Sequence, residues 1–95
     1  MAIFRRGDDA NLRMAIIEAD KLIDEILKKA GFVGEDMGQR LENINAAQIS
    51  SIDELWQAHR VRNRIAHETD FKLTAQEAEK AIKIYEKALT ELGAI

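Results

Sequence analysis

Apolar residues recur at three- and four-residue spacing along almost the whole chain, and this periodicity limits the possible folds more than any other feature. The spacing places side chains on one face of an α-helix, whereas a half-buried strand alternates apolar and polar residues. No alternation of period two is long enough to predict a strand. The sequence therefore predicts an all-α protein.

The first predicted helix covers residues 10–30 and has a clear start and end. Asp8 or Asp9 can cap its first turn, and Gly31 follows its last turn as a typical C-terminal stop. A short helix over residues 37–44 comes next, followed by a loop over residues 45–49. The apolar faces of these two helices are formed by Leu12, Ile16, Ala19, Ile23, Ile26, Ala30, Met37, Leu41 and Ile44.

Two capping boxes predict the remaining helices. Ser51 with Glu54 begins a helix that runs to residue 68, and Thr74 with Glu77 begins one that ends before Gly93. The expected fold is an antiparallel four-helix-type bundle of three long helices and one short helix. We expect the chain to consist of a flexible N-terminal tail over residues 1–9 and one helical domain over residues 10–95.

Composition excludes several classes of protein. The 95 residues are 46% hydrophobic and 33% charged, which fits one folded domain and is too apolar for disorder. The chain has no cysteine and its two histidines lack zinc-site spacing, so we expect no metal and no cofactor. No apolar run could cross a bilayer and no secretory signal is apparent, so the expectation is a cytoplasmic protein without membrane insertion.

The helix predicted after Ser51 has an unusually wide apolar face. At ~100° per residue, its apolar residues from Ile52 to Ala66 cover an arc of roughly 220°, more than one core-facing stripe requires. A helix of this kind is buried on two sides. We therefore expect a homodimer formed through this third helix.

Polar residues interrupt the same arc. Arg62, Asn63 and His59 fall inside it, and His67 lies at its edge. An unpaired buried charge costs several kcal/mol, so a residue such as Arg62 needs a partner or a function. Violations of this kind occur at functional sites and in buried polar networks.

The interrupted arc also concentrates positive charge. The net charge of the chain is −3, yet the segment from Leu55 to His67 contains three arginines, two histidines and no acid. An arginine fork matches a phosphate, and histidine exchanges protons near neutral pH. We therefore count Arg60, Arg64 and His59 as candidate RNA- or phosphate-binding residues.

The run Arg62-Asn63-Arg64-Ile65-Ala66-His67 resembles the motif of the HEPN superfamily, in which an arginine and a histidine are separated by a short variable spacer near the end of a helix. The resemblance covers nearly the whole chain in architecture and six residues in motif. It implies a dimeric, metal-independent RNA endonuclease in which the ribose 2′-hydroxyl attacks the adjacent phosphate. It also implies an antitoxin or a larger protein as a partner.

The resemblance assigns a catalytic role to three residues. His67 would transfer a proton, Arg62 would hold the phosphate, and Asn63 would orient His67. Two features depart from the family pattern. Toxin members carry a tyrosine two residues after the histidine, where this chain has Thr69, and an ideal helix places Arg62 and His67 about 140° apart.

A second interpretation assigns no catalytic role to these residues. The chain would be a non-catalytic helical dimerisation or accessory domain, in which Arg62 and Asn63 form a buried polar network with Asp20 or Glu18 on the first helix. In this interpretation, His59 is a buried histidine with a satisfied hydrogen bond, and Arg60 and Arg64 are solvated. The sequence leaves both interpretations open.

Overall fold

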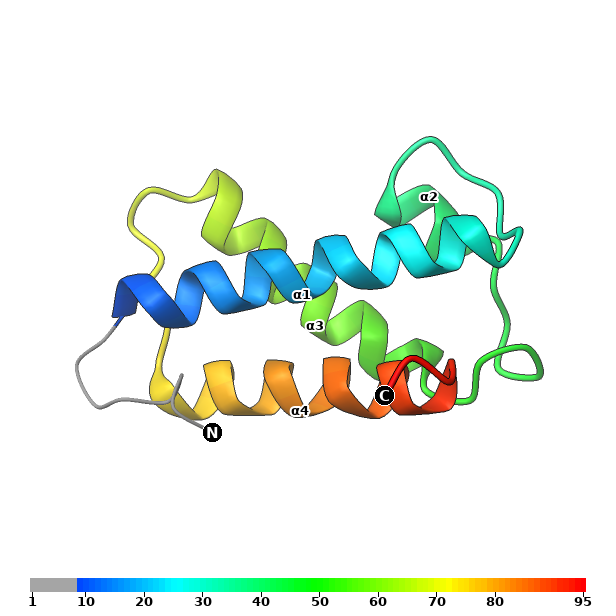
Figure 1. The fold of residues 1–95 in the computed structure, drawn as a ribbon. Helices are drawn as coiled ribbons and strands as arrows, with labels where there is room; N and C mark the ends of the chain where they lie inside the picture. The colour runs from blue at the N-terminus through cyan, green and yellow to red at the C-terminus, as the bar shows by residue number, and fades with distance from the viewer. Residues whose placement is uncertain (1–8) are drawn as a thin grey trace.

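The computed structural model describes the backbone from residue 9 to residue 95 and contains four α-helices joined by loops (Figure 1). They are α1 (Asp9–Lys29), α2 (Met37–Glu42), α3 (Ile52–His67) and α4 (Ala75–Glu91). The predicted all-α bundle of three long helices and one short helix is therefore confirmed. The expected tail over residues 1–9 lies outside the described residues except for Asp9, which already belongs to α1.

The three long helices pack against one another around a common core. α3 runs opposite to α1 and α4, which point in the same direction, and the short α2 lies beside the C-terminal half of α1 (Figure 1). The core is formed by buried side chains from all four helices, among them Ile16, Ile23, Leu27, Leu41, Leu55, Ala58, Ala78, Ala81, Ile82, Tyr85, Ala88 and Leu89. Burial of these apolar faces, rather than helix propensity, holds the helices in place.

The wide apolar arc of α3 has partners within one chain. α3 contacts α1, α2 and α4, so its neighbours cover it from several directions. Leu55 is buried, Val61 and Ile65 are half-buried and packed against the core, and Ala66 is exposed. Burial on more than one side therefore does not by itself require a second copy, and the homodimer stays a prediction.

The helix ends follow the sequence signals in part. Thr74 and Glu77 form the predicted capping box of α4, and Gly93 follows that helix with a φ of 76°. The capping box predicted for α3 is wrong, although Ser51 is its N-cap residue. The Ser51 hydroxyl donates to Glu91 at 2.8 Å, and Glu54 pairs with Lys87 at 2.7 Å, because the end of α4 brings charged partners to this place.

Within the part of the chain that the structure describes, no helix combines the length and the apolar character that are needed to span a bilayer.

Candidate functional site

A groove with a volume of about 560 Å³ lies among α1, α2 and α3. Arg62, Asn63 and His67 all line it, and so does His59. The groove therefore brings the three residues of the Arg-Asn-His motif together, although an ideal helix separates Arg62 from His67 by about 140°. The long side chain of Arg62 and the position of His67 at the last residue of α3 allow this.

Asp20 of α1 is a buried carboxylate at the base of this groove. Its Oδ2 lies 2.9 Å from Nδ1 of His59 and accepts a hydrogen bond of 2.8 Å from the hydroxyl of Tyr85. Its Oδ1 lies 3.9 Å from Nε of Arg62. Of the two acids considered for Arg62, Asp20 is therefore the one beside it, whereas Glu18 is exposed.

Tyr85 of α4 is a partner of Asp20 that was not identified from the sequence. Its ring is buried in the core, and its hydroxyl completes the polar cluster from the side of α4. The signal was present, because a buried tyrosine hydroxyl needs a hydrogen-bond partner. Burial, reinforced by the negative charge of Asp20, raises the pKa of Tyr85 far above its usual value, so the hydroxyl stays protonated and donates.

Arg62 is neither sealed in the core nor fully solvated. A third of its side chain, 33%, is exposed, and Nη1 donates to Oδ1 of Asn63 at 3.0 Å. Its Nε is buried and has no hydrogen-bond acceptor among the described residues. Asn63 therefore holds Arg62, whereas the resemblance assigned it to His67. The guanidinium is positioned at the groove with part of its hydrogen-bonding capacity unused.

The expected positive patch is offset by acids from other helices. The groove is also lined by Asp24, Glu35 and Asp36, in addition to Asp20, and by the single lysine Lys21. The segment from Leu55 to His67 contains no acid, but α1 and the loop before α2 bring four carboxylates to the same groove. The concentrated positive patch predicted from the sequence is therefore wrong for the groove.

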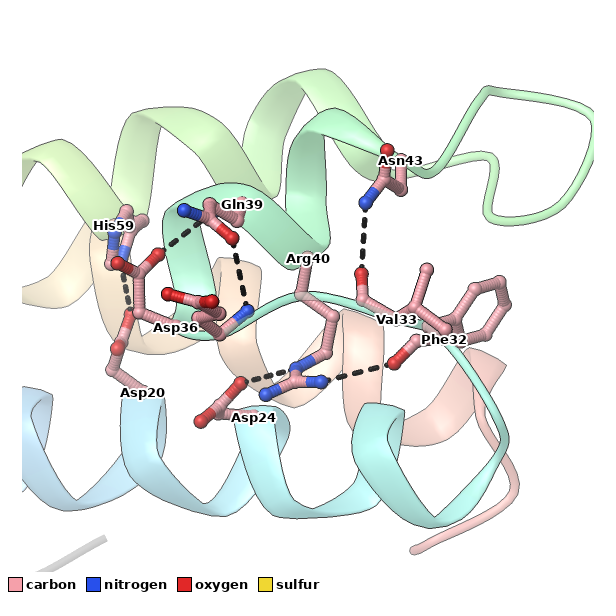
Figure 2. Close-up of polar contacts among 10 residues, drawn as sticks. Asp20, Asp24, Phe32, Val33, Asp36, Gln39, Arg40, Asn43 and His59 are labelled. Carbon is pink, nitrogen blue, oxygen red and sulfur yellow. Dashed lines mark hydrogen bonds and ion pairs between the residues drawn. The ribbon is translucent and has the colours of Figure 1, made fainter.

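A buried arginine, Arg40, stabilises the wall formed by α1 and α2. Arg40 is 5% exposed, and its Nε donates to Asp24 at 2.7 Å while its Nη1 donates to the carbonyl of Phe32 at 3.0 Å (Figure 2). Asn43 donates to the carbonyl of Val33 in the same loop. Arg40 was not identified from the sequence, although Arg40 lies on the apolar side of α2 and interrupts the apolar pattern of that helix as Arg62 does in α3.

Arg60 and Arg64, two of the candidate phosphate-binding residues, do not line the groove. Arg60 is exposed with its guanidinium 5.6 Å from the ring of Trp56, and Arg64 lies 4.2 Å from the ring of Phe71. Arg64 also pairs with Glu68 at 3.4 Å. Their role in binding RNA stays a prediction for a surface separate from the groove.

The groove offers hydrogen-bonding and proton-transfer groups rather than a set of metal ligands. Across residues 9–95, no group of three or more histidine, cysteine or acidic side chains could hold a metal ion. Comparison with protein-family models, with curated proteins and with solved structures finds no match for this chain.

Proposed function

We propose that this chain is a HEPN-like module that binds single-stranded RNA in the groove and cleaves it without a metal ion. The observation that carries the proposal is that Arg62, Asn63 and His67 line one groove, with Arg62 incompletely paired. A guanidinium held in place by Asn63 is prepared to bind a phosphate, since its exposed edge keeps donors that Asp20 does not use.

In the proposed reaction, Arg62 contacts the phosphate oxygens and stabilises the negative charge that develops on them. The ribose 2′-oxygen attacks the phosphorus, which leaves a cyclic phosphate and a 5′-hydroxyl. His67 is exposed at the end of α3 and can give a proton to the leaving oxygen. Single-stranded RNA is the suitable substrate because its backbone can adopt the in-line arrangement of attacking and leaving oxygens.

The acidic residues of the groove limit how RNA can bind. Glu35 and Asp36 would repel neighbouring phosphates, so we expect one phosphate to be neutralised, at Arg62. The logarithm of the binding constant should then fall with the logarithm of salt concentration with a slope of about −0.7. Fluorescence anisotropy with a short labelled RNA measures this slope, and a slope of about −1.4 or steeper would indicate at least two neutralised phosphates, as expected for binding at Arg60 and Arg64.

Single-turnover cleavage of single-stranded RNA tests the proposal. Arg62→Met and His67→Asn should each reduce the rate by about 100-fold or more, as expected when a phosphate clamp or a proton donor is lost. Lys80→Met is the matched control, because Lys80 is an exposed cation of α4 outside the groove. Equal cleavage by all four proteins, or no cleavage by the wild type, would contradict the proposal.

One observation favours a second candidate function, a non-catalytic helical accessory domain. Asp20 binds His59 and Tyr85 and lies beside Arg62, so a structural network alone accounts for these polar residues. In that case, Arg62→Met would change the free energy of unfolding by about 1 kcal/mol or less, since its Nε makes no hydrogen bond to the described residues. No RNA-dependent signal would accompany that change.

A further inference from the structure

His59 is held in a fixed orientation that His67 lacks. Its Nδ1 lies 2.9 Å from Oδ2 of Asp20, and both side chains are buried. The same oxygen already accepts the hydroxyl hydrogen of Tyr85, and the positive charge of Arg62 lies beside the other oxygen. Asp20 therefore acts as an acceptor toward its neighbours, so Nδ1 of His59 carries the hydrogen of this bond.

The other ring nitrogen of His59 faces the groove. Nε2 makes no hydrogen bond to any residue in the described part of the chain, and it is not sealed from solvent. A Cβ atom built on Gly38 would lie 3.9 Å from Nε2 and 3.4 Å from Oδ1 of Asp36. The absence of a side chain at Gly38 therefore keeps space open in front of Nε2.

The hydrogen bond to Asp20 and the open space beside Gly38 determine which proton transfers Nε2 can make. With the hydrogen on Nδ1, Nε2 of the neutral ring has a lone pair and accepts a hydrogen bond. A carboxylate that holds the far nitrogen also stabilises the imidazolium after a proton is taken up. An imidazole in this arrangement is prepared to remove a proton from a hydroxyl group of a bound ligand.

We propose that His59 is the general base of the groove and that Asp20 is its positioning residue; the inference rests on the proposed function. The O2′–H bond breaks and its proton goes to Nε2 of His59, while the 2′-oxygen forms a bond to phosphorus. The P–O5′ bond breaks, and the leaving oxygen takes a proton from protonated His67. Exchange of protons with water then restores both imidazoles.

The three residues of this proposal come from one helix, α3. His59 and His67 are eight residues apart, which corresponds to a rise of about 12 Å. Arg62 lies between them in sequence and lines the same groove. One chain therefore supplies a base, a phosphate clamp and an acid, so the reaction needs no histidine from a second copy.

The tautomer of His59 provides a test that does not depend on cleavage. Imidazole ¹⁵N spectra of the wild-type chain at neutral pH should show hydrogen on Nδ1 and a lone pair on Nε2. Asp20→Asn should weaken this preference, because Nδ1 then no longer faces a charged acceptor. A wild-type His59 with its hydrogen on Nε2 would overturn the inference, whether or not the chain cleaves RNA.

Cleavage rates separate this inference from the proposed function. His59→Gln should reduce single-turnover cleavage by about 100-fold or more while RNA binding is retained. Gly38→Leu should have a similar effect by filling the space before Nε2, and it leaves His59 and the core unchanged. Glu42→Leu is the matched control, because Glu42 is exposed on the same helix and does not line the groove.

The outcomes are distinguishable. Undiminished cleavage by folded His59→Gln and Gly38→Leu, with loss of cleavage in Arg62→Met, would overturn the role of His59 and leave the proposed function standing. Undiminished cleavage in Arg62→Met and His67→Asn would overturn the proposed function. Absence of cleavage by the wild type would overturn both. Helical circular dichroism establishes that each variant is folded.

Discussion

Asp20 is the residue on which the polar cluster depends. Its carboxylate is 3% exposed and faces donors from α3 and α4. A buried charge is tolerated only when it is paired and hydrogen-bonded, and removal of one partner leaves the others unsatisfied. The sequence analysis found this cluster in part, because Arg62 and Asn63 violated the apolar arc. It could not assign Tyr85, since a tyrosine in an apolar stripe does not reveal its partner.

Asp20→Ala should therefore lower the free energy of unfolding by about 3–5 kcal/mol, because His59 and Tyr85 lose their common hydrogen-bond acceptor and Arg62 loses the charge beside it. Urea denaturation followed by circular dichroism measures the change. Glu18→Ala is the control, since Glu18 is an exposed acid on the same helix and should shift stability by less than about 0.5 kcal/mol. Equal stability of the two variants would contradict the assigned role of Asp20.

Tyr85 predicts a pH effect at the alkaline end. Burial and the charge of Asp20 raise the pKa of Tyr85 above its usual value of 10.0, so the contribution to stability is fully present below pH 10 and is lost as the pH rises further. Tyr85 is the only tyrosine, so tyrosinate absorbance reports it alone. Tyrosinate should appear only as helical circular dichroism is lost. Ionisation near pH 10 with intact helices would contradict this account.

At the scale of the elements, apolar periodicity and end signals located all four helices to within about two residues. The α4 capping box was predictable because Thr74 and Glu77 are close in sequence. The α3 capping box failed because its N-cap region meets Glu91 from α4, a contact between residues distant in sequence. Arg40 was missed for a related reason, since Asp24 reaches it only when α2 folds back on α1.

Glu91 should couple the start of α3 to the end of α4 in a pH-dependent way. Hydrogen bonds from the Ser50 backbone and from Ser51 lower the pKa of Glu91 from its usual value of 4.5. The stabilisation is therefore present above pH 4.5 and is lost as the pH falls through the lowered value. Glu91→Gln should destabilise by less than about 1 kcal/mol at pH 7, because the site is exposed.

The same comparison at low pH checks the mechanism. The difference in unfolding free energy between the wild type and Glu91→Gln should shrink toward zero below the lowered pKa of Glu91. Glu86→Gln provides the control for loss of an exposed acid on α4. A difference that does not change with pH would show that Glu91 acts through packing rather than through its charge.

At the scale of the whole molecule, the bundle followed from the sequence but the character of the groove did not. The positive segment of α3 was visible in the sequence, whereas the acids opposite it come from α1 and from the loop before α2. Their approach depends on how the helices pack, which local patterns do not encode. The predicted homodimer also depends on how the helices pack, because α3 already contacts three helices of its own chain and only its remaining exposed surface could bind a second copy.

Sedimentation equilibrium tests the predicted homodimer through α3. Val61 is half-buried and lies in a shallow surface groove between α3 and α4, so Val61→Glu should shift a dimer of this kind to monomer. Leu22→Glu is the control, since Leu22 is 45% exposed on α1 and should leave the equilibrium unchanged. A wild-type chain that is monomeric at all concentrations would contradict the dimer.

The proposed binding of RNA in the groove beside Arg62 is tested most directly by an NMR titration. Addition of a short single-stranded RNA to the ¹⁵N-labelled wild-type chain should shift the signals of Gly38, His59, Asn63 and His67, which line the groove with Arg62. Shifts confined to the exposed Arg60 and Arg64, or no shifts at all, would contradict the claim.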